Sequence, residues 1–446
     1  MRIVTILALV ALSGSAHALT SGTGDNRAEI QAMIDATPSG GVLLLPSGEF
    51  FVSRYSTTDH ALRIPAGVTV RGSGGATILK QLAGTPDGVR LIAMDGAGAS
   101  LERITLDGNA DAQMAGEHRA GPFITAPVTL RDVVARNFTG DGVYLHAGAG
   151  GTRLDNVTAT GNHRNGVTLG WQMAGVTIVG GLYANNTAQQ IDSEPAAGQT
   201  VDNVTITGAI IDGGSSSNFA ITVSGTSSTA RSHGWRVTGN VINGSIHVVW
   251  TDDVTIAGNA IANGSSDFGI DVYRTSSHVT IAGNAIAMTD ASRSYPSAIA
   301  AIGTGGTSRP SRLVIVDNDI TSASLSSTGV RLDGCSDVVV ASNRLTGPGV
   351  TSSLGSALYA RATDPDLPFD LVTFVGNVAT GFGQRGIDIR GNGTARITRM
   401  RAVGNTLGDA TSIQPIGVSL DDGLHPLLAS DIVGNTYGSG VTAGRL

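Results

Sequence analysis

The chain contains very few cysteine, lysine and aromatic residues. Among its 446 residues there is one cysteine, Cys335, and one lysine, Lys80, while aromatic residues make up 4%. A single cysteine excludes an internal disulfide framework, so packing alone must stabilise the fold in an oxidising compartment. A single lysine leaves Lys80 as the one candidate for any mechanism that uses a lysine base.

The chain also lacks a basic excess and, beyond its first residues, a long apolar run. The formal net charge is −7, which argues against a nucleic-acid partner because such a partner requires a basic surface. A basic start and an apolar run at 3–12 precede the small-residue segment A-H-A at 16–18, the pattern of a secretory signal peptide. We therefore expect residues 1–18 to be a signal peptide, too short to span a membrane. Residues 19–446 should then form one domain, secreted or periplasmic, without a membrane partner.

The chain is rich in glycine, with 62 residues, and in short segments of Val, Ile and Thr. One strand pattern reads x-V-T-I-x-G-N and another reads G-V-x-L, as at 142–145 and 166–169, which start 24 residues apart. Because side chains alternate along a strand, the Val and Leu residues of these segments should face inward. Such repeats, without helices between the strands, predict an all-β right-handed parallel β-helix.

Residues 27–36 predict a helix that covers the first coil of this solenoid. Ile30, Met33 and Ile34 form an apolar stripe at helical spacing, and Asn26 with Glu29 has the spacing of a capping box. A cap of this kind prevents the strand edges of the first coil from pairing with other chains.

Three repeated features are expected to be structural. Glycines that precede inward strands, such as Gly142 and Gly166, indicate turn geometry, and Asn259 and Asn284 indicate a ladder of stacked side-chain amides. Outward residues of alternating charge in the second half of the chain should form ion-pair ladders or, alternatively, contact an oligosaccharide. These residues are Asp271, Tyr273, Arg274, Arg331, Asp333, Arg361, Asp388 and Arg390.

The N-terminal segments 23–36, 40–50 and 64–74 resemble those of a known superfamily. They read T-G-D-N-R-A-E-I-Q-A-M-I-D-A, G-G-V-L-L-L-P-S-G-E-F and I-P-A-G-V-T-V-R-G-S-G, which is similar to the pectate-lyase-like right-handed parallel β-helix proteins. That superfamily includes polysaccharide lyases, alginate C5-epimerases, glycoside hydrolases and phage tailspikes. The segment N-H-R-N-G at 162–166 is similar to the N-D-R-H-G of the epimerases, whereas their D-P-H-[ED] segment is absent. The resemblance implies an extended polysaccharide as substrate and a monomer or homotrimer as the assembly.

Two His-Arg pairs recur in the same phase of the repeat. G-E-H-R-A-G at 116–121 and G-N-H-R-N-G at 161–166 should lie two coils apart, about 10 Å at a strand spacing of ~4.8 Å, with Asp141 between them. We expect His163 or His118 to act as a base, and Arg164 or Arg119 to neutralise a substrate carboxylate. Among the four, His163 and Arg164 are assigned to catalysis, and His118 and Arg119 to substrate binding.

The segment at 189–195 departs most strongly from the repeat. Ser193 replaces an inward aliphatic residue, Pro195 ends the strand, and Asp192 and Glu194 point outward together. Two such carboxylates suit either a cation site, for which Ca²⁺ is the candidate, or general acid–base catalysis. Tyr144 is a further candidate acid or base. His146 and Trp171 are candidate substrate-binding residues.

These residues indicate chemistry on an acidic polysaccharide. Eliminative cleavage or epimerisation of a uronate requires that its carboxylate be neutralised and its C5 proton removed, and a lyase must also protonate the leaving oxygen O4. We therefore predict a polysaccharide lyase or epimerase whose catalytic residues are His163, Arg164, Tyr144, Asp141, Asp192 and Glu194. One alternative is a glycoside hydrolase or glycan transferase that uses the three carboxylates. A second alternative is a glycan-binding solenoid without catalytic activity.

Overall fold

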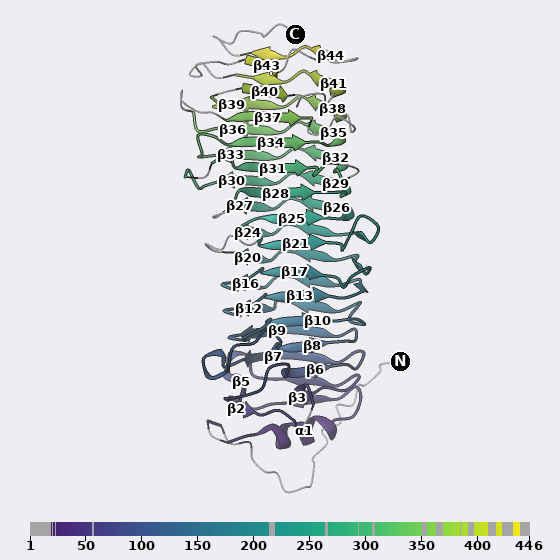
Figure 1. Cartoon of the computed structure of the whole chain (residues 1–446). Helices are drawn as coiled ribbons and strands as arrows, with labels where there is room; N and C mark the ends of the chain where they lie inside the picture. The colour runs from purple at the N-terminus through teal and green to yellow at the C-terminus, as the bar shows by residue number, and fades with distance from the viewer. Residues whose placement is uncertain are drawn as a thin grey trace, which may run out of the picture.

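The protein is a parallel β-helix preceded by one short helix, as the sequence predicts (Figure 1). The computed structural model describes residues 19, 21–22, 24–55, 58–213, 219–263, 266–292, 294–305, 308–349, 355–362, 369–383, 385–390, 397–408, 416–421 and 431–437. The expected signal peptide at 1–18 lies outside these residues, so it stays a prediction. No helix of the described chain is long and apolar enough to cross a membrane.

One side of the solenoid is a sheet of 14 parallel strands, each contributed by a different coil. In spatial order its strands are β3 (His60–Arg63), β6 (Arg90–Met94), β8 (Pro122–Ile124), β10 (Val143–Leu145), β13 (Val167–Gly170), β17 (Ile191–Glu194), β21 (Ile221–Ser224), β25 (Ile246–Val249), β28 (Phe268–Tyr273), β31 (Ser297–Ile302), β34 (Thr328–Asp333), β37 (Ser356–Arg361), β40 (Arg385–Arg390) and β43 (Ile416–Asp421). In Figure 1 these strands form the central column of arrows.

The remaining strands form a 29-stranded sheet and one two-stranded sheet, which together complete each coil. The larger sheet contains β1 (Val42–Leu44), β2 (Gly48–Val52), β4 (Thr69–Arg71), β5 (Thr77–Gln81), β7 (Ser100–Asp107), β9 (Thr129–Arg136), β11 (Arg153–Asp155), β12 (Thr158–Thr160), β15 (Thr177–Val179), β16 (Leu182–Ala184), β19 (Thr205–Thr207), β20 (Ile210–Asp212), β22 (Ser232–His233), β23 (Arg236–Thr238), β24 (Val241–Asn243), β26 (Thr251–Ala257), β27 (Ala260–Ala262), β29 (Ser277–Ala282), β30 (Ala285–Met288), β32 (Ser311–Val316), β33 (Asp319–Ser322), β35 (Ser336–Ala341), β36 (Arg344–Thr346), β38 (Phe369–Val375), β39 (Val378–Thr380), β41 (Ile397–Val403), β42 (Thr406–Leu407), β44 (Asp431–Val433) and β45 (Thr436–Tyr437). The smaller one pairs β14 (Met173–Ala174) with β18 (Val201–Asp202), and two 3₁₀ turns lie at Gly74–Ala76 and Ala110–Ala112.

The helix α1 (Arg27–Asp35) buries Ile30 and Ile34 against the first coil, as expected of a cap. The predicted capping box is wrong, however. The Asn26 side chain makes no capping hydrogen bond, because its amide instead donates to the carbonyl of Gly24 at 3.3 Å. Burial of the apolar stripe on the first coil therefore stabilises this helix more than its own N-terminus does.

The strands alternate as their sequences predict. Val143 pairs in register with Val167, and Leu145 with Leu169, and all four side chains are fully buried. Each such aliphatic side chain contributes roughly 1.5–3 kcal/mol when it is removed from water. Between them, Tyr144 and its register neighbours point outward, so the 14-stranded sheet presents a continuous outer face.

The asparagine ladder is confirmed and extends further than the two residues that suggested it. Each amide donates to the side-chain oxygen of the next coil's asparagine at 2.9–3.0 Å. The ladder runs through Asn240, Asn259, Asn284, Asn318, Asn343, Asn377, Asn405 and Asn435. It satisfies buried polar groups at the same corner of successive coils.

The glycines before the inward strands serve a different purpose from the one expected. Gly142 and Gly166 do not have positive φ angles, so turn geometry is not the reason for them. A Cβ on Gly142 would lie 2.6 Å from the carbonyl oxygen of Gly166, and one on Gly166 would lie 2.5 Å from that of Gln190. Glycine is required here because successive coils approach one another too closely for a side chain.

Candidate active site

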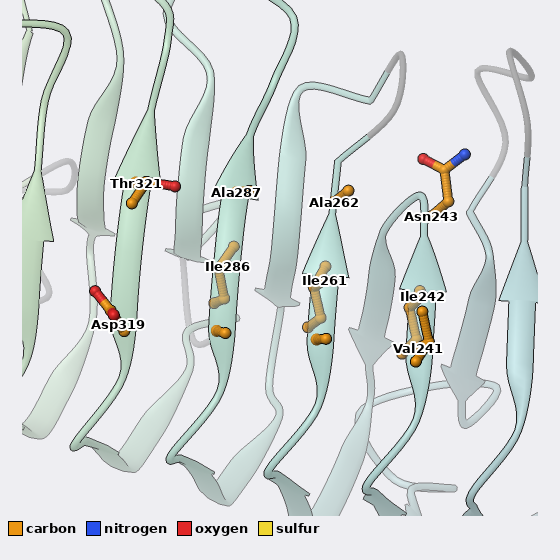
Figure 2. Close-up of a pocket in the computed structure, with 11 residues that line it drawn as sticks. Val241, Ile242, Asn243, Ile261, Ala262, Ile286, Ala287, Asp319 and Thr321 are labelled. Carbon is orange, nitrogen blue, oxygen red and sulfur yellow. The ribbon is translucent and has the colours of Figure 1, made fainter.

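Two of the cavities lie on different sheets, and one is lined mainly by apolar side chains whereas the other is lined mainly by charged and polar ones. Figure 2 shows a hollow of about 380 Å³ on the 29-stranded sheet, along β24, β27, β30 and β33, lined mainly by aliphatic and alanine side chains. Asp319 is the one carboxylate in that lining. Groups that can transfer protons gather instead on the outer face of the 14-stranded sheet.

A cavity of about 170 Å³ lies over β6, β8, β10, β13 and β17. Its walls come from strands and from the turns that precede them, so residues far apart in sequence meet there. It is lined by Arg90, Glu117, His118, Ala120, Asp141, Tyr144, Arg164 and Glu194. We refer to this cavity as the polar cavity.

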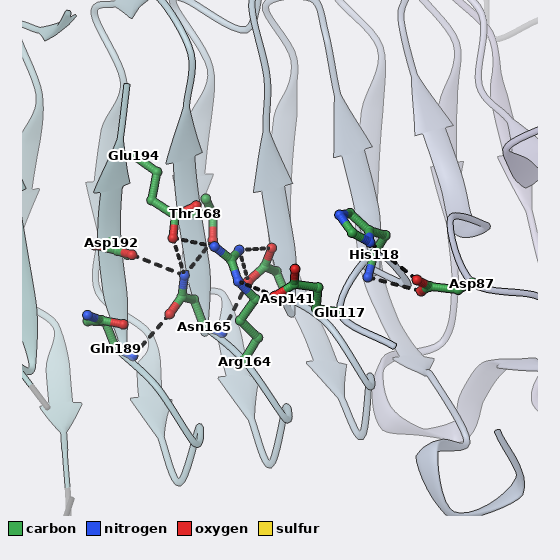
Figure 3. Close-up of polar contacts among 10 residues, drawn as sticks. All are labelled: Asp87, Glu117, His118, Asp141, Arg164, Asn165, Thr168, Gln189, Asp192 and Glu194. Atoms are coloured by element: carbon green, nitrogen blue, oxygen red, sulfur yellow. Dashed lines mark hydrogen bonds and ion pairs between the residues drawn. The ribbon is translucent and has the colours of Figure 1, made fainter. Parts of the chain in front are cut away.

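Arg164 joins carboxylates from three coils, as Figure 3 shows. One Nη donates to both oxygens of Asp141, at 2.8 and 3.0 Å. The other donates to Glu194, and Nε lies 3.7 Å from a carboxylate oxygen of Glu117. Since Asp141 is almost fully buried, this guanidinium is the counter-charge that makes its burial tolerable.

Asn165 completes this network, although it is not among the site residues predicted from sequence. Its backbone N–H donates to Asp141 at 3.1 Å, and its amide donates to Thr168 at 3.0 Å and to Asp192 at 3.2 Å. Its side-chain oxygen accepts the backbone N–H of Gln189 at 3.0 Å. The signal in the sequence was its position after Arg164, where a coil turns into an outward-facing strand.

The carboxyl groups of the network do not share one protonation state. Burial, together with a hydrogen bond to Glu194, raises the pKa of Asp192 to about 8. Burial would raise the pKa of Glu194 as well, but hydrogen bonds from Arg164 and Asp192 outweigh it and lower that pKa. Burial raises the pKa of Asp141 to about 6 against the opposing charge of Arg164. At neutral pH one proton therefore lies between Asp192 and Glu194.

An aromatic wall borders the cavity. The ring of Phe123 lies 5.5 Å from that of Tyr144 and 5.4 Å from that of His146, and His146 lies 4.7 Å from Trp171. Burial and the nearby charge of Arg90 lower the pKa of His146, so this histidine is neutral at pH 7. His146 and Trp171, both predicted to bind substrate, are thus brought together.

Trp171 is held in an unusual backbone conformation. It is 43% exposed and has φ = 65°, in the left-handed region that bulky residues rarely adopt. Burial raises the pKa of the Tyr144 hydroxyl, which borders the same aromatic wall. The Tyr144 hydroxyl therefore keeps its proton at neutral pH. The residues that directly follow β25 and β28, Trp250 (φ = 50°) and Arg274 (φ = 57°), have the same backbone conformation as Trp171, so it belongs to this turn of the coil.

Two further residues line the cavity: Arg90, which was not predicted from sequence, and His118, which was. Arg90 stacks its guanidinium on the Phe123 ring at 4.5 Å, and its buried Nε has no hydrogen-bond partner among the described residues. His118, predicted to bind substrate, has its Nδ1 at 3.2 Å from Asp87, which also accepts the His118 backbone N–H. No local sequence motif predicts a role for Arg90, because the ring on which it stacks, that of Phe123, belongs to the following coil.

The two His-Arg pairs lie in the same phase of the repeat, as predicted. Their arginines differ, because Arg164 lines the polar cavity and Arg119 does not. Arg164 donates its backbone N–H to the carbonyl of Gly140, and Gly140 donates to that of Arg119, so the pairs are two coils apart. Arg119 is buried and donates to the carbonyls of Thr85 and Met114. It supports the turn that carries His118 instead of lining the cavity.

His163, one of the two predicted bases, has an exposed side chain and does not line the polar cavity. Its backbone N–H donates to the carbonyl of Phe138 at 2.8 Å. The sole lysine, Lys80, lies on β5 of the other sheet, 3.8 Å from Glu49. The structure thus brings together Asp141, Tyr144, Arg164, Asp192 and Glu194, without His163.

A Ca²⁺ site at Asp192 and Glu194 does not fit the present arrangement. Glu194 is paired with Arg164, and Asp192 accepts from the Asn165 amide at 3.2 Å, whereas Ca²⁺ takes six to eight oxygen ligands. Among the described residues no group of three or more His, Cys, Asp or Glu side chains is arranged to hold a metal ion. We derive no step of the chemistry from a cation at this pair.

Comparison with known proteins finds relatives among enzymes of alginate. No family model matches the chain. Two mannuronan C5-epimerases of Azotobacter vinelandii match 191 residues, 39% of this chain: AlgE3 at 30% identity and AlgE4 at 28%. The match spans 10% of AlgE3 and 34% of AlgE4. Among solved structures, an alginate lyase in complex with a trisaccharide covers 82% of this chain and 85% of its own, with a TM-score of 0.55 and 13% identity. The chain is therefore a parallel β-helix related in sequence to mannuronan C5-epimerases and similar in fold to an alginate lyase.

Proposed function

From this relationship we propose that the protein is a carbohydrate-active enzyme that removes the C5 proton of a uronate residue in an acidic polysaccharide. One observation carries the proposal. A single small cavity collects an arginine with an unpaired buried Nε, a histidine oriented by a carboxylate, and a protonated tyrosine hydroxyl. These are the groups required to neutralise a carboxylate, accept a proton and donate one.

Arg90 is the residue that we assign to the substrate carboxylate. Arg164 already binds Asp141 and Glu194, so its charge is largely committed. The carboxylate nearest to Arg90 is that of Asp59, at 3.5 Å, and Asp59 is largely exposed. Stacking on Phe123 fixes the plane of the Arg90 guanidinium, which favours two-point binding of a carboxylate.

His118 is our candidate for the base. A hydrogen bond from Nδ1–H to Asp87 fixes the tautomer in which Nε2 carries a lone pair. Asp87 also accepts the His118 backbone N–H at 3.1 Å, which fixes the carboxylate beside the ring. Removal of C5–H, made acidic by the neutralised carboxylate, would then transfer a proton to Nε2.

Tyr144 is our candidate for the acid. Tyr144 lines the polar cavity, and burial raises the pKa of its hydroxyl, which therefore has a proton to give at neutral pH. In an elimination this hydrogen would go to the leaving oxygen O4, and in an epimerisation to C5 from the opposite face. The sequence relatives support epimerisation, and both outcomes share the same first step.

The hydrolase alternative is favoured by the neutral Asp192 beside the ionised Glu194, which together resemble an acid and a base. Their existing partners argue against it. The Asn165 amide donates to Asp192 at 3.2 Å and to Glu194 at 3.4 Å, and Glu194 also accepts from Arg164. We assign this pair to the support of Arg164 and Asn165.

The experiment that tests the proposal is incubation with alginate, with pectate and with a neutral glucan. Ultraviolet absorbance reports a new C4–C5 double bond, proton NMR reports a changed uronate configuration, and reducing ends report any cleavage. We expect absorbance or a changed configuration on one acidic polymer. Reducing ends without absorbance, on any polymer, would mean hydrolysis and would contradict the proposal.

Variants then assign the roles. Loss of a general base or acid costs about 10²–10⁴-fold in rate, so His118→Ala and Tyr144→Phe should each lower kcat by that order. His163→Ala tests the base predicted from sequence, and we expect it to retain activity because its side chain lies outside the cavity. Full activity of His118→Ala together with an inactive His163→Ala would reverse the assignment.

A further inference from the structure

We propose that the outer face of the 14-stranded sheet carries a second binding site for the acidic polysaccharide, at β34, β37 and β40. The identity of its ligand rests on the proposed function. The site would hold uronate residues of the same polysaccharide chain whose other part lies in the polar cavity. Figure 1 shows these strands in the same column as β10, β13 and β17.

A cavity of about 320 Å³ marks the site. It is lined by Tyr295, Ser326, Thr328, Arg331, Ser356, Tyr359, Asp388 and Arg390. These are hydroxyl, guanidinium and carboxylate side chains with two aromatic rings, the mixture that sugar binding requires. A uronate offers both hydroxyl groups and a carboxylate to such a lining.

The two cavities lie along one line of register positions. Asp192 follows Ile191, which pairs with Ile221 of the next coil. Thr222 of that coil pairs with His247, and the pairing continues through Asp271 and Ala300 to Arg331. From β17 to β34 there are five strand steps, or about 24 Å at ~4.8 Å each. A glycan several residues long that lies across the strands would reach both cavities.

Arginine outnumbers carboxylate at the second site. Among the described side chains, four guanidinium groups, of Arg331, Arg361, Arg385 and Arg390, surround two buried carboxylates, of Asp333 and Asp388. This local excess occurs in a chain whose formal net charge is −7, so it selects for an anionic ligand.

The buried carboxylates position the arginines for binding. Asp333 accepts from Arg331 at 2.6 Å and from Arg361 at 3.1 Å. Asp388 accepts from Arg385 at 2.6 Å and from Arg390 at 2.9 Å. The residues do form ion pairs, but of these four contacts only that of Arg361 with Asp333 joins two coils, as the expected ladder would. Because each carboxylate is shared by two guanidinium groups, the arginines are ordered in advance without being neutralised, which lowers the entropy cost of binding.

The second site repeats the construction of the polar cavity. Arg390 lies 5.5 Å from the Tyr359 ring, as Arg90 lies over Phe123. Tyr295 is 62% exposed and has φ = 58°, a left-handed conformation like that of Trp171. An exposed ring held in this way provides a flat apolar platform for a sugar ring beside the arginine cluster.

The test compares long and short substrates in the full chain. Variants Arg390→Ala and Tyr295→Ala are compared with Arg399→Ala, which removes an exposed arginine paired with Asp370 on the other sheet. A lost charged hydrogen bond should raise the KM for polymeric alginate at least about tenfold. The kcat and the KM for a trisaccharide should not change. Arg390→Ala leaves the buried Asp388 with one guanidinium fewer and could therefore fail to fold. Tyr295→Ala removes an exposed ring, so it tests the site even in that case.

A binding measurement separates failure of this inference from failure of the proposed function. Affinity electrophoresis in gels that contain alginate or a neutral glucan requires no catalysis. Retardation by alginate that is lost in Tyr295→Ala and Arg390→Ala, but kept in Arg399→Ala, would support the site even in a protein without activity. Equal retardation of all variants, or an equal rise in KM for trisaccharide and polymer, would overturn it.

Discussion

The side chain of Tyr144 occupies the space that a side chain of Gly170 would fill. A Cβ on Gly170 would lie 2.7 Å from Cε2 of Tyr144 and 2.9 Å from its hydroxyl oxygen. Gly170 is the outward position of β13 next to Glu194 of β17. The missing side chain therefore lets the tyrosine cross one strand and bring its hydroxyl close to the carboxyl network.

Gly170→Ala should displace the Tyr144 hydroxyl while leaving the coil intact. We expect kcat to fall about 10²-fold, the effect of misplacing a reacting group by about 1 Å, with thermal stability close to that of the wild type. Gly75→Ala is the matched control, because nothing lies within 4 Å of its Cβ position. Unchanged kcat in Gly170→Ala would mean that the position of Tyr144 does not matter for the chemistry.

Asp192→Asn should change how stability depends on pH. The folded protein holds the Asp192 proton up to about pH 8, whereas the unfolded chain releases it near the ordinary aspartate pKa of 3.8. The wild type therefore loses stability as pH rises between these values. The variant carries an uncharged amide in place of the protonated carboxyl group and loses this dependence.

The measurement is Tm from pH 4 to pH 9. Relative to the wild type, the Tm of Asp192→Asn should rise steadily with pH and should be higher at pH 9. Asp155→Asn, on the other sheet, should give a curve parallel to that of the wild type. Parallel curves for Asp192→Asn would show that Asp192 is ionised in the folded protein at neutral pH.

Arg164→Ala should destabilise the fold as well as the site, because it leaves Asp141 buried without a counter-charge. Removing one partner of a buried ion pair costs about 3–5 kcal/mol, to be measured by urea unfolding. The exposed pair of Arg153 with Asp155 provides the control, since Arg153→Ala should cost at most about 1 kcal/mol. Equal losses in the two variants would place Arg164 among ordinary surface arginines.

His146→Phe separates stacking from proton transfer. A phenyl ring keeps the contacts with Phe123 and Trp171 but cannot accept a proton. We expect kcat within about threefold of the wild type, against the loss of about 10²–10⁴-fold expected of a general base. A loss of that size in His146→Phe, with His118→Ala active, would move the base from His118 to His146.

The repeat made most of the fold predictable from sequence. Alternation of Val and Leu with outward residues, and asparagines at a fixed place in each coil, depend on one coil and its neighbour, so they appear as a local pattern. The reason for glycine at position 142 could not be predicted from the local pattern, because the group that excludes a side chain there is the Gly166 carbonyl of the following coil.

The site was predictable only in part, for the same physical reason. The carboxylates and Tyr144 break the repeat and so stand out in sequence, and the structure brings them together. Arg119 and Arg164 have the same local motif, yet one is buried and the other binds Asp141 and Glu194. Arg90 has no motif, because its place is fixed by Phe123 of the next strand. Which way a long side chain turns depends on the coil beside it.

The central claim is that C5–H is broken, and proton NMR of the polysaccharide incubated with the enzyme in D₂O tests it most directly. Epimerisation replaces C5–H by C5–D, and elimination removes the hydrogen altogether, so both outcomes remove the C5 proton signal. The account predicts loss of that signal with the wild type and its persistence with His118→Ala. Depolymerisation with the C5 signal intact would contradict the account and indicate a hydrolase.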